Sequence, residues 1–250
     1  MRVSGKQWPG RSHVCRCESL RVRRAESAVD EHASGPLQAV ALRYGSAASE
    51  RLAGMTDLSD PKAALHHYLQ AVRDNLIWKL DGLSEREARR PRTATGNNLL
   101  GVLKHCLNVE AGYFGPGFGR EFSSPGELVA LQAFEEDPQA DWYAREDETK
   151  DGLIDLYRRV GLFVDQTIEQ LPLDAPGRVP WWPPGSQAVT LQRIIVHVTV
   201  DLARHAGHAD IMREQHDRAI GLRRENSGVP DDYDWPAYVT RLTTLAERFE

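Results

Sequence analysis

"IIVHVTVDLARHAGHADIMRE", residues 194–214, combines the apolar periodicity of a helix with ionisable side chains on one face. Four of these side chains, separated by four, four and three residues, are His197, Asp201, His205 and His208. An α-helix turns by about 100° per residue, so the four fall within one strip about 80° wide. The apolar residues that share or flank this strip are Ile194, Val198, Val200, Leu202, Ala209, Ile211 and Met212. We therefore expect the strip to face the interior, where a charge must be paired or bound to metal.

The composition is that of a globular protein. The chain has 250 residues, of which 41% are hydrophobic and 27% charged, which suits one good-sized domain or two small ones. No apolar run approaches the ~20 residues that cross a bilayer, and no secretory signal is recognisable. The three cysteines, Cys15, Cys17 and Cys106, do not form a disulfide framework. These features favour a reducing, cytoplasmic setting.

The first 54 residues differ from the remainder. They carry nine Lys/Arg and five Asp/Glu and show no sustained helical or strand period. We predict that residues 1–54 are a disordered or misannotated extension and that residues 55–250 form the folded domain. That domain is acidic, with 22 Lys/Arg and 31 Asp/Glu. We therefore expect neither a nucleic-acid partner nor a membrane partner.

Four long amphipathic segments and one shorter C-terminal segment predict an all-α fold. The predicted helices cover about 61–80, 98–114, 150–171, 190–214 and 235–249. Asp60 and Thr190 are expected N-caps. No convincing strand pattern is present, and the Pro/Gly-rich residues 172–187 are expected to lack regular structure. The pattern is typical of a four-helix bundle with an extra C-terminal helix.

The histidine strip has three interpretations: a hydrogen-bonded polar layer in the core, a metal site, or an exposed face. A metal site needs a further ligand from another helix. His105 offers one, because it lies toward the edge of the apolar face of the second helix. A lone histidine at that position is also compatible with ordinary packing.

These residues together resemble a known family. One histidine on the second helix, followed on the fourth by H-x-x-x-[H/E/D]-x-x-x-H-x-G-[H/Q], is similar to the DinB/YfiT-like superfamily. The run "HVTVDLARHAGHADIMRE" resembles its actinobacterial DUF664 branch, and the resemblance spans about residues 58–250. It implies a four-helix bundle whose divalent metal is bound by His105, Asp201 and His205. The mycothiol-dependent maleylpyruvate isomerase type has Glu at the Asp201 position. Asp is shorter, so His208 or His197 is an alternative ligand.

The resemblance also implies a chemistry. Characterised members of the superfamily are S-transferases or isomerases that use a low-molecular-weight thiol such as mycothiol. Two imidazoles and one carboxylate leave an open position on zinc, and they also suit nickel, iron or manganese. The expected partners are a thiol and a small electrophile, and the chain is compatible with a homodimer. The alternatives are a non-catalytic, stress-related metal-binding bundle and a structural bundle without metal.

Two further residues are candidates for catalysis. Glu110 lies near the middle of an apolar face, where it could act as a base or as an outer-shell acceptor. An ion pair with an arginine such as Arg204 or Arg213 is the alternative. His197 could orient Asp201 or be a satisfied core histidine.

The remaining candidates concern cofactor binding. Arg204 and Arg213 are candidate ligands of the thiol cofactor. Trp181 and Trp182, within "VPWWPPG", either line an apolar pocket or close one end of the bundle. Cys106 follows His105 directly, but helical geometry turns it toward the packed face. We therefore expect Cys106 to be a core residue rather than a nucleophile.

Overall fold

The computed structural model describes residues 58–223 and 227–249. The predicted extension, residues 1–54 with Cys15 and Cys17, lies outside the described residues.

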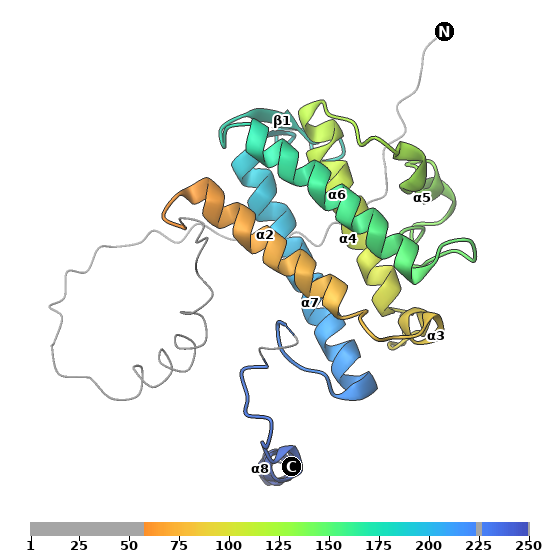
Figure 1. Ribbon diagram of the computed structural model, residues 1–250, viewed down its shortest axis with the longest axis vertical. Coiled ribbons are helices and arrows are strands. Elements are labelled where there is room, and N and C mark those ends of the chain that lie inside the picture. Colours follow the sequence, from red (N-terminus) through yellow and green to blue (C-terminus); the bar gives the residue numbers. More distant parts are fainter. Residues whose placement is uncertain (1–57, 224–226, 250) are drawn as a thin grey trace, which may run out of the picture. The chain divides into compact units, whose positions relative to one another are not determined.

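The fold is built from four long helices (Figure 1). They are α2 (Pro61–Trp78), α4 (Leu99–Phe114), α6 (Lys150–Gln170) and α7 (Leu191–Asp217). Helix α4 packs against α6 and α7, and α2 packs against the same two helices. The four helices therefore follow the order α2, α7, α4, α6 around the bundle, with α2 diagonal to α4. This arrangement confirms the predicted all-α bundle.

Each long helix begins at a polar side chain that accepts a hydrogen bond from its first turn. Asp60 accepts from the N–H of Ala63 at 2.8 Å, and Pro61 occupies the first turn of α2. Thr190 accepts from the N–H of Arg193 at 3.3 Å. Such caps satisfy N–H groups that have no partner within the helix. Both predicted N-caps are confirmed.

The core consists mainly of aliphatic side chains from these four helices. On α7 the buried face is formed by Leu191, Ile194, Ile195, Val198, Leu202, Ala206, Ala209 and Met212. By contrast, Val200 and Ile211 are 66% and 57% exposed. The expectation that both flank a buried surface was wrong, because α7 turns only one side toward α2 and α4. The histidine strip therefore lies at the edge of the buried face.

A short antiparallel hairpin lies between α6 and α7. It pairs β1 (Pro176–Arg178) with β2 (Ala188–Thr190), with Pro176 opposite Thr190. The prediction that this Pro/Gly-rich stretch lacks regular structure was wrong. Strands of three residues are too short for an alternating pattern to be recognised. The two tryptophans of "VPWWPPG" lie in the loop of this hairpin.

Short helices complete the described structure. They are α3 (Glu85–Arg89), η1 (Pro116–Phe118), η2 (Pro125–Glu127), α5 (Ala133–Glu136), α8 (Trp235–Ala246) and η3 (Glu247–Phe249). Helix α8 is the predicted extra C-terminal helix. Among the helices that the structure describes, none combines the length and the apolar character needed to cross a bilayer.

Candidate metal centre

Helices α4 and α7 bring three side chains together, which we call the triad: His105, Asp201 and His205. One candidate ligand atom from each lies within 4.8 Å of the other two. Nε2 of His205 is 3.7 Å from Oδ1 of Asp201, one helical turn away. The rings of His105 and His205 meet edge to face at 4.8 Å between centroids. The spacing on α7 and the contact between α4 and α7 therefore place three candidate ligands close together.

His205 has the properties of a metal ligand. Its side chain is buried, and its Nδ1 has no hydrogen-bond partner among the described residues. Burial, followed by the neighbouring charge of His105, lowers the pKa of His205 to about 4. The imidazole is therefore neutral at pH 7, which is the form that binds metal. The donor set and the unpartnered buried nitrogen both fit a divalent cation.

A connecting segment supports the triad from outside. Nδ1 of His105 lies 2.8 Å from Oδ2 of Asp141. The ring of Trp142 stacks on His105 at 4.0 Å and 17°, and meets His205 edge to face at 5.1 Å. Sequence reasoning missed both residues, because they lie in a polar segment without periodicity. An adjacent acid and aromatic pair was the one available signal there.

His197 belongs to an aromatic cluster rather than to the triad. Its Nε2 is 3.2 Å from the hydroxyl of Tyr113, which also accepts a 3.0 Å hydrogen bond from Nε1 of Trp182. Trp182 and Trp181 pack edge to face against Tyr113. Burial lowers the pKa of His197. Sequence reasoning missed the contact of His197 with Tyr113. The alternative that His197 orients Asp201 stays a prediction.

His208 and Arg204 are exposed on α7. The ring of His208 meets that of His205 edge to face at 5.6 Å, yet His208 is outside the triad. The structure therefore favours Asp201 over His208 as the third ligand. Arg204 lies close enough for its charge to contribute to the lowered pKa of His205.

Glu110 is fully buried in the bundle. It accepts hydrogen bonds from Nε of Arg73 at 2.6 Å and from the hydroxyl of Tyr157 at 2.7 Å. Burial raises the pKa of Glu110. Both carboxylate oxygens have partners within the core. This geometry matches the alternative of an ion pair with an arginine, although the arginine is Arg73, and the catalytic role of Glu110 stays a prediction. Cys106 is also fully buried, as predicted, and burial raises the pKa of its thiol.

Arg213 stabilises the end of α2. Its NH1 donates to the carbonyl oxygens of Lys79 and Asp81, both at 2.8 Å. Its Nε and NH2 donate to the carboxylate of Asp217. Through these contacts the guanidinium of Arg213 links α7 to the C-terminal end of α2. The expected role of Arg213 in binding the cofactor stays a prediction.

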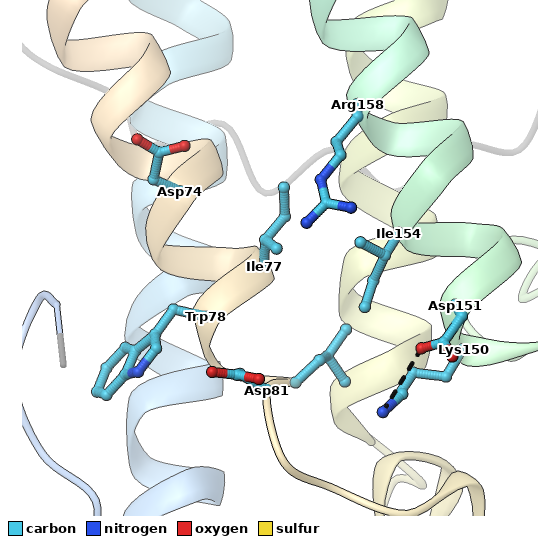
Figure 2. Close-up of a pocket in the computed structure, with 9 residues that line it drawn as sticks. Asp74, Ile77, Trp78, Asp81, Lys150, Asp151, Ile154 and Arg158 are labelled. Carbon is cyan, nitrogen blue, oxygen red and sulfur yellow. Dashed lines mark ion pairs between the residues drawn. The ribbon is translucent and has the colours of Figure 1, made fainter.

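A groove of about 530 Å³ lies along α2 and α6, and Figure 2 shows the side chains that line it. It is lined by side chains of α2, α6 and the segment after α2, among them Trp78, Asp151 and Arg158. The triad lies on α4 and α7, so none of its members lines this groove. The groove is separate from the candidate metal centre.

Comparison with known proteins adds one finding. The family model described as mycothiol-S-transferase matches residues 64–218, more than half of the chain. The matched range includes all three residues of the triad. Among curated proteins, none matches this chain.

Proposed function

Since this chain belongs to the mycothiol-S-transferase family, which is DinB/YfiT-like, we propose that it is a metal-dependent enzyme. Its reaction forms a C–S bond between a low-molecular-weight thiol, such as mycothiol, and a small electrophile, while the S–H bond breaks and its proton passes to water. In a transfer a leaving group departs from the electrophilic carbon with its bonding electrons, and in an isomerisation the thiol adds and is released again. The observation that supports this proposal is the proximity of His105, Asp201 and His205 at the interface between α4 and α7.

The triad would hold the metal ion. Two imidazoles and one carboxylate suit zinc first, and also nickel, iron or manganese. A divalent ion held there supplies an open position at which a thiol is stabilised as thiolate, its reactive form. His205 would be ready to bind without losing a proton, because its low pKa keeps it neutral.

Neighbouring side chains would receive the thiol and the electrophile. Half-buried Tyr113 and Trp182 and exposed His197 form a surface with apolar rings and polar tips, and His197 precedes Asp201 by one turn of α7. Half-exposed Trp181 adds an apolar face that could hold the electrophile. Exposed Arg204, next to His205, could donate hydrogen bonds to polar groups of the thiol. The cytoplasmic location and the homodimer stay predictions.

A conjugation assay tests the proposal. The purified full chain is stripped with chelator, reloaded with zinc, and mixed with mycothiol and a chromogenic aryl chloride. We expect product only with metal, and none from His205→Ala. His208→Ala is the matched control, since it removes an imidazole outside the triad. Absence of metal-dependent turnover would contradict the enzymatic proposal, and tight zinc binding without turnover would favour the non-catalytic metal-binding alternative.

A further inference from the structure

The segment between α5 and α6, residues 137–149, is attached to α4 by buried polar contacts. Nζ of Lys104 donates to the carbonyl oxygen of Tyr143 at 3.0 Å and pairs with Glu148 at 2.8 Å. Lys104 itself is almost fully buried. Nδ2 of Asn98 donates to the carbonyl oxygen of Trp142 at 3.4 Å. A polar segment is thereby held against a helix that carries a residue of the triad.

Gly101 allows this segment to approach α4 closely. A Cβ at position 101 would lie 1.8 Å from the carbonyl oxygen of Trp142 and 2.6 Å from its carbonyl carbon. These are backbone atoms, so a larger residue would push the segment away from the helix. Gly101 lies one turn before His105 on α4. The position of the segment relative to His105 therefore depends on a glycine at this point.

Asp141, which belongs to this segment, contacts Nδ1 of the His105 ring. Asp141 is only 5% exposed, and its Oδ2 is 2.8 Å from Nδ1 of His105. An ionised carboxylate only accepts hydrogen bonds, so in the neutral form of an imidazole, the form that binds metal, this contact places the proton on Nδ1. Nε2 is then the nitrogen that keeps a free lone pair. In known metal sites such a carboxylate partner fixes the tautomer and orientation of the ligating histidine.

The next residue fixes the plane of the ring. Trp142 stacks on His105 with an interplanar angle of 17° and contacts the edge of His205. Asp141 therefore selects the tautomer of His105, and Trp142 restricts the orientation of its ring. Trp142 also contacts the ring of His205.

We propose that Asp141 is a positioning residue for the candidate metal centre: it holds His105 as the Nδ1–H tautomer, with Trp142 holding the ring plane. The functional part of this inference rests on the proposed metal-dependent function, whereas the tautomer does not.

The first test is the tautomer of His105 in the metal-free full chain, measured by long-range 15N–1H NMR. Wild-type protein should carry the proton on Nδ1. Asp141→Ala should shift His105 toward the Nε2–H form, whereas Asp141→Asn should retain Nδ1–H because its amide oxygen still accepts. A wild-type proton on Nε2, or an unchanged tautomer in folded Asp141→Ala, would overturn the proposal. If Asp141→Ala does not fold, the wild-type spectrum still decides.

The second test is zinc affinity, measured by competition with a chromophoric chelator. Loss of such a partner typically weakens metal binding by about 10–100-fold, and we expect this for Asp141→Ala. Asp147→Asn is the matched control, because it removes a carboxylate from the same segment that is exposed and pairs with Arg145. Equal affinity of Asp141→Ala and wild type would overturn the positioning role.

A third variant moves the segment without altering Asp141. Gly101→Ala should weaken zinc binding and disturb the His105 signals, because the new Cβ collides with Trp142. Gly112→Ala, also on α4, is the control, since a Cβ there meets nothing within 4 Å. Unchanged zinc affinity and an unchanged His105 spectrum in Gly101→Ala would contradict the proposal.

The two inferences can fail separately. A wild-type chain with Nδ1–H at His105 but no zinc binding would remove the proposed function and leave the positioning of the ring intact. Zinc affinity that is unchanged in Asp141→Ala would remove the positioning role of Asp141 and leave the proposed metal-dependent function intact.

Discussion

Two groups of ionisable side chains, one in the core and one at the edge of the buried face of α7, differ in how their charges are balanced. The arginine cluster, where α2, α4 and α6 meet, consists of Arg73, Glu110, Tyr157 and Asp165. The triad lies at the interface between α4 and α7. In sequence both groups appear as polar residues on apolar helix faces, and only the structure separates them.

The arginine cluster contains its own counter-charge. Arg73 donates from Nε to Glu110 at 2.6 Å and from NH1 to Asp165 at 2.5 Å, while Tyr157 donates to the other oxygen of Glu110. Burial alone raises the pKa of Asp165, but the hydrogen bond from His66 and the charge of Arg73 lower it to about 2. The cluster is therefore a structural unit.

The triad has no such internal cation. It consists of two imidazoles and one carboxylate, and Nδ1 of His205 has no partner in the described part of the chain. The arginine cluster also leaves one buried nitrogen unpaired, NH2 of Arg73, but a guanidinium nitrogen only donates. A neutral imidazole offers a lone pair. The comparison teaches that the presence or absence of an internal cation, rather than burial alone, distinguishes a closed network from a candidate cation site.

The largest expected effect comes from breaking the arginine cluster. Glu110→Gln removes one of the two carboxylates that face the buried guanidinium of Arg73. Breaking a buried pair costs about 3–5 kcal/mol, and we expect about 3 kcal/mol because Asp165 remains. Urea unfolding measures the change. Zinc should still stabilise the variant, and a folded Glu110→Gln protein without a zinc response would contradict the separation of the two groups.

Adding metal should stabilise only a chain with an intact triad. Zinc at 100 times its Kd raises the free energy of unfolding by about 2.7 kcal/mol when binding is confined to the folded state. We expect this increase in wild-type protein and its loss in His205→Ala. Thermal unfolding with zinc and with chelator provides the measurement. An equal increase in His205→Ala would place the ion elsewhere.

Acid should weaken the arginine cluster in a defined window. The pKa of Asp165 is about 2 in the folded chain, below its ordinary value of 3.8, so its contribution is fully present above pH 4. That contribution, roughly 1–2 kcal/mol given its partial exposure, is lost as the pH falls toward 2. Urea unfolding at pH 5, 3 and 2 should show wild type converging on Asp165→Asn. A constant difference would disprove the assignment.

The smallest effect is expected outside both groups. His208 is exposed and lies outside the triad, so His208→Ala should change the free energy of unfolding by no more than about 0.5 kcal/mol. Its zinc affinity, measured by chelator competition, should equal that of wild type. A marked loss of affinity would show that His208 rather than Asp201 completes the site.

Much of the site could be predicted from the helical pattern. Asp201 and His205 are one turn apart on a single helix, so their proximity follows from local geometry. The helical pattern offered His105 only as a candidate, and the resemblance to a family was needed to join it to Asp201 and His205, because these lie on another helix. Tyr113 and Trp182 meet only through the hairpin, and no sequence spacing relates them. An ion pair of Glu110 with Arg204 or Arg213 was one of the alternatives, whereas the arginine that pairs with Glu110 is Arg73, 37 residues away on α2.

The sequence by itself determined the four helices, their N-caps and the residues that share each face, because these depend on contacts within a few residues. The tertiary structure alone decided which edge of α7 is buried, which arginine faces Glu110, and that Asp141 reaches His105. These depend on the rotation of each helix against its neighbours and on the path of an irregular segment. Both are set by packing between residues that are far apart in the chain.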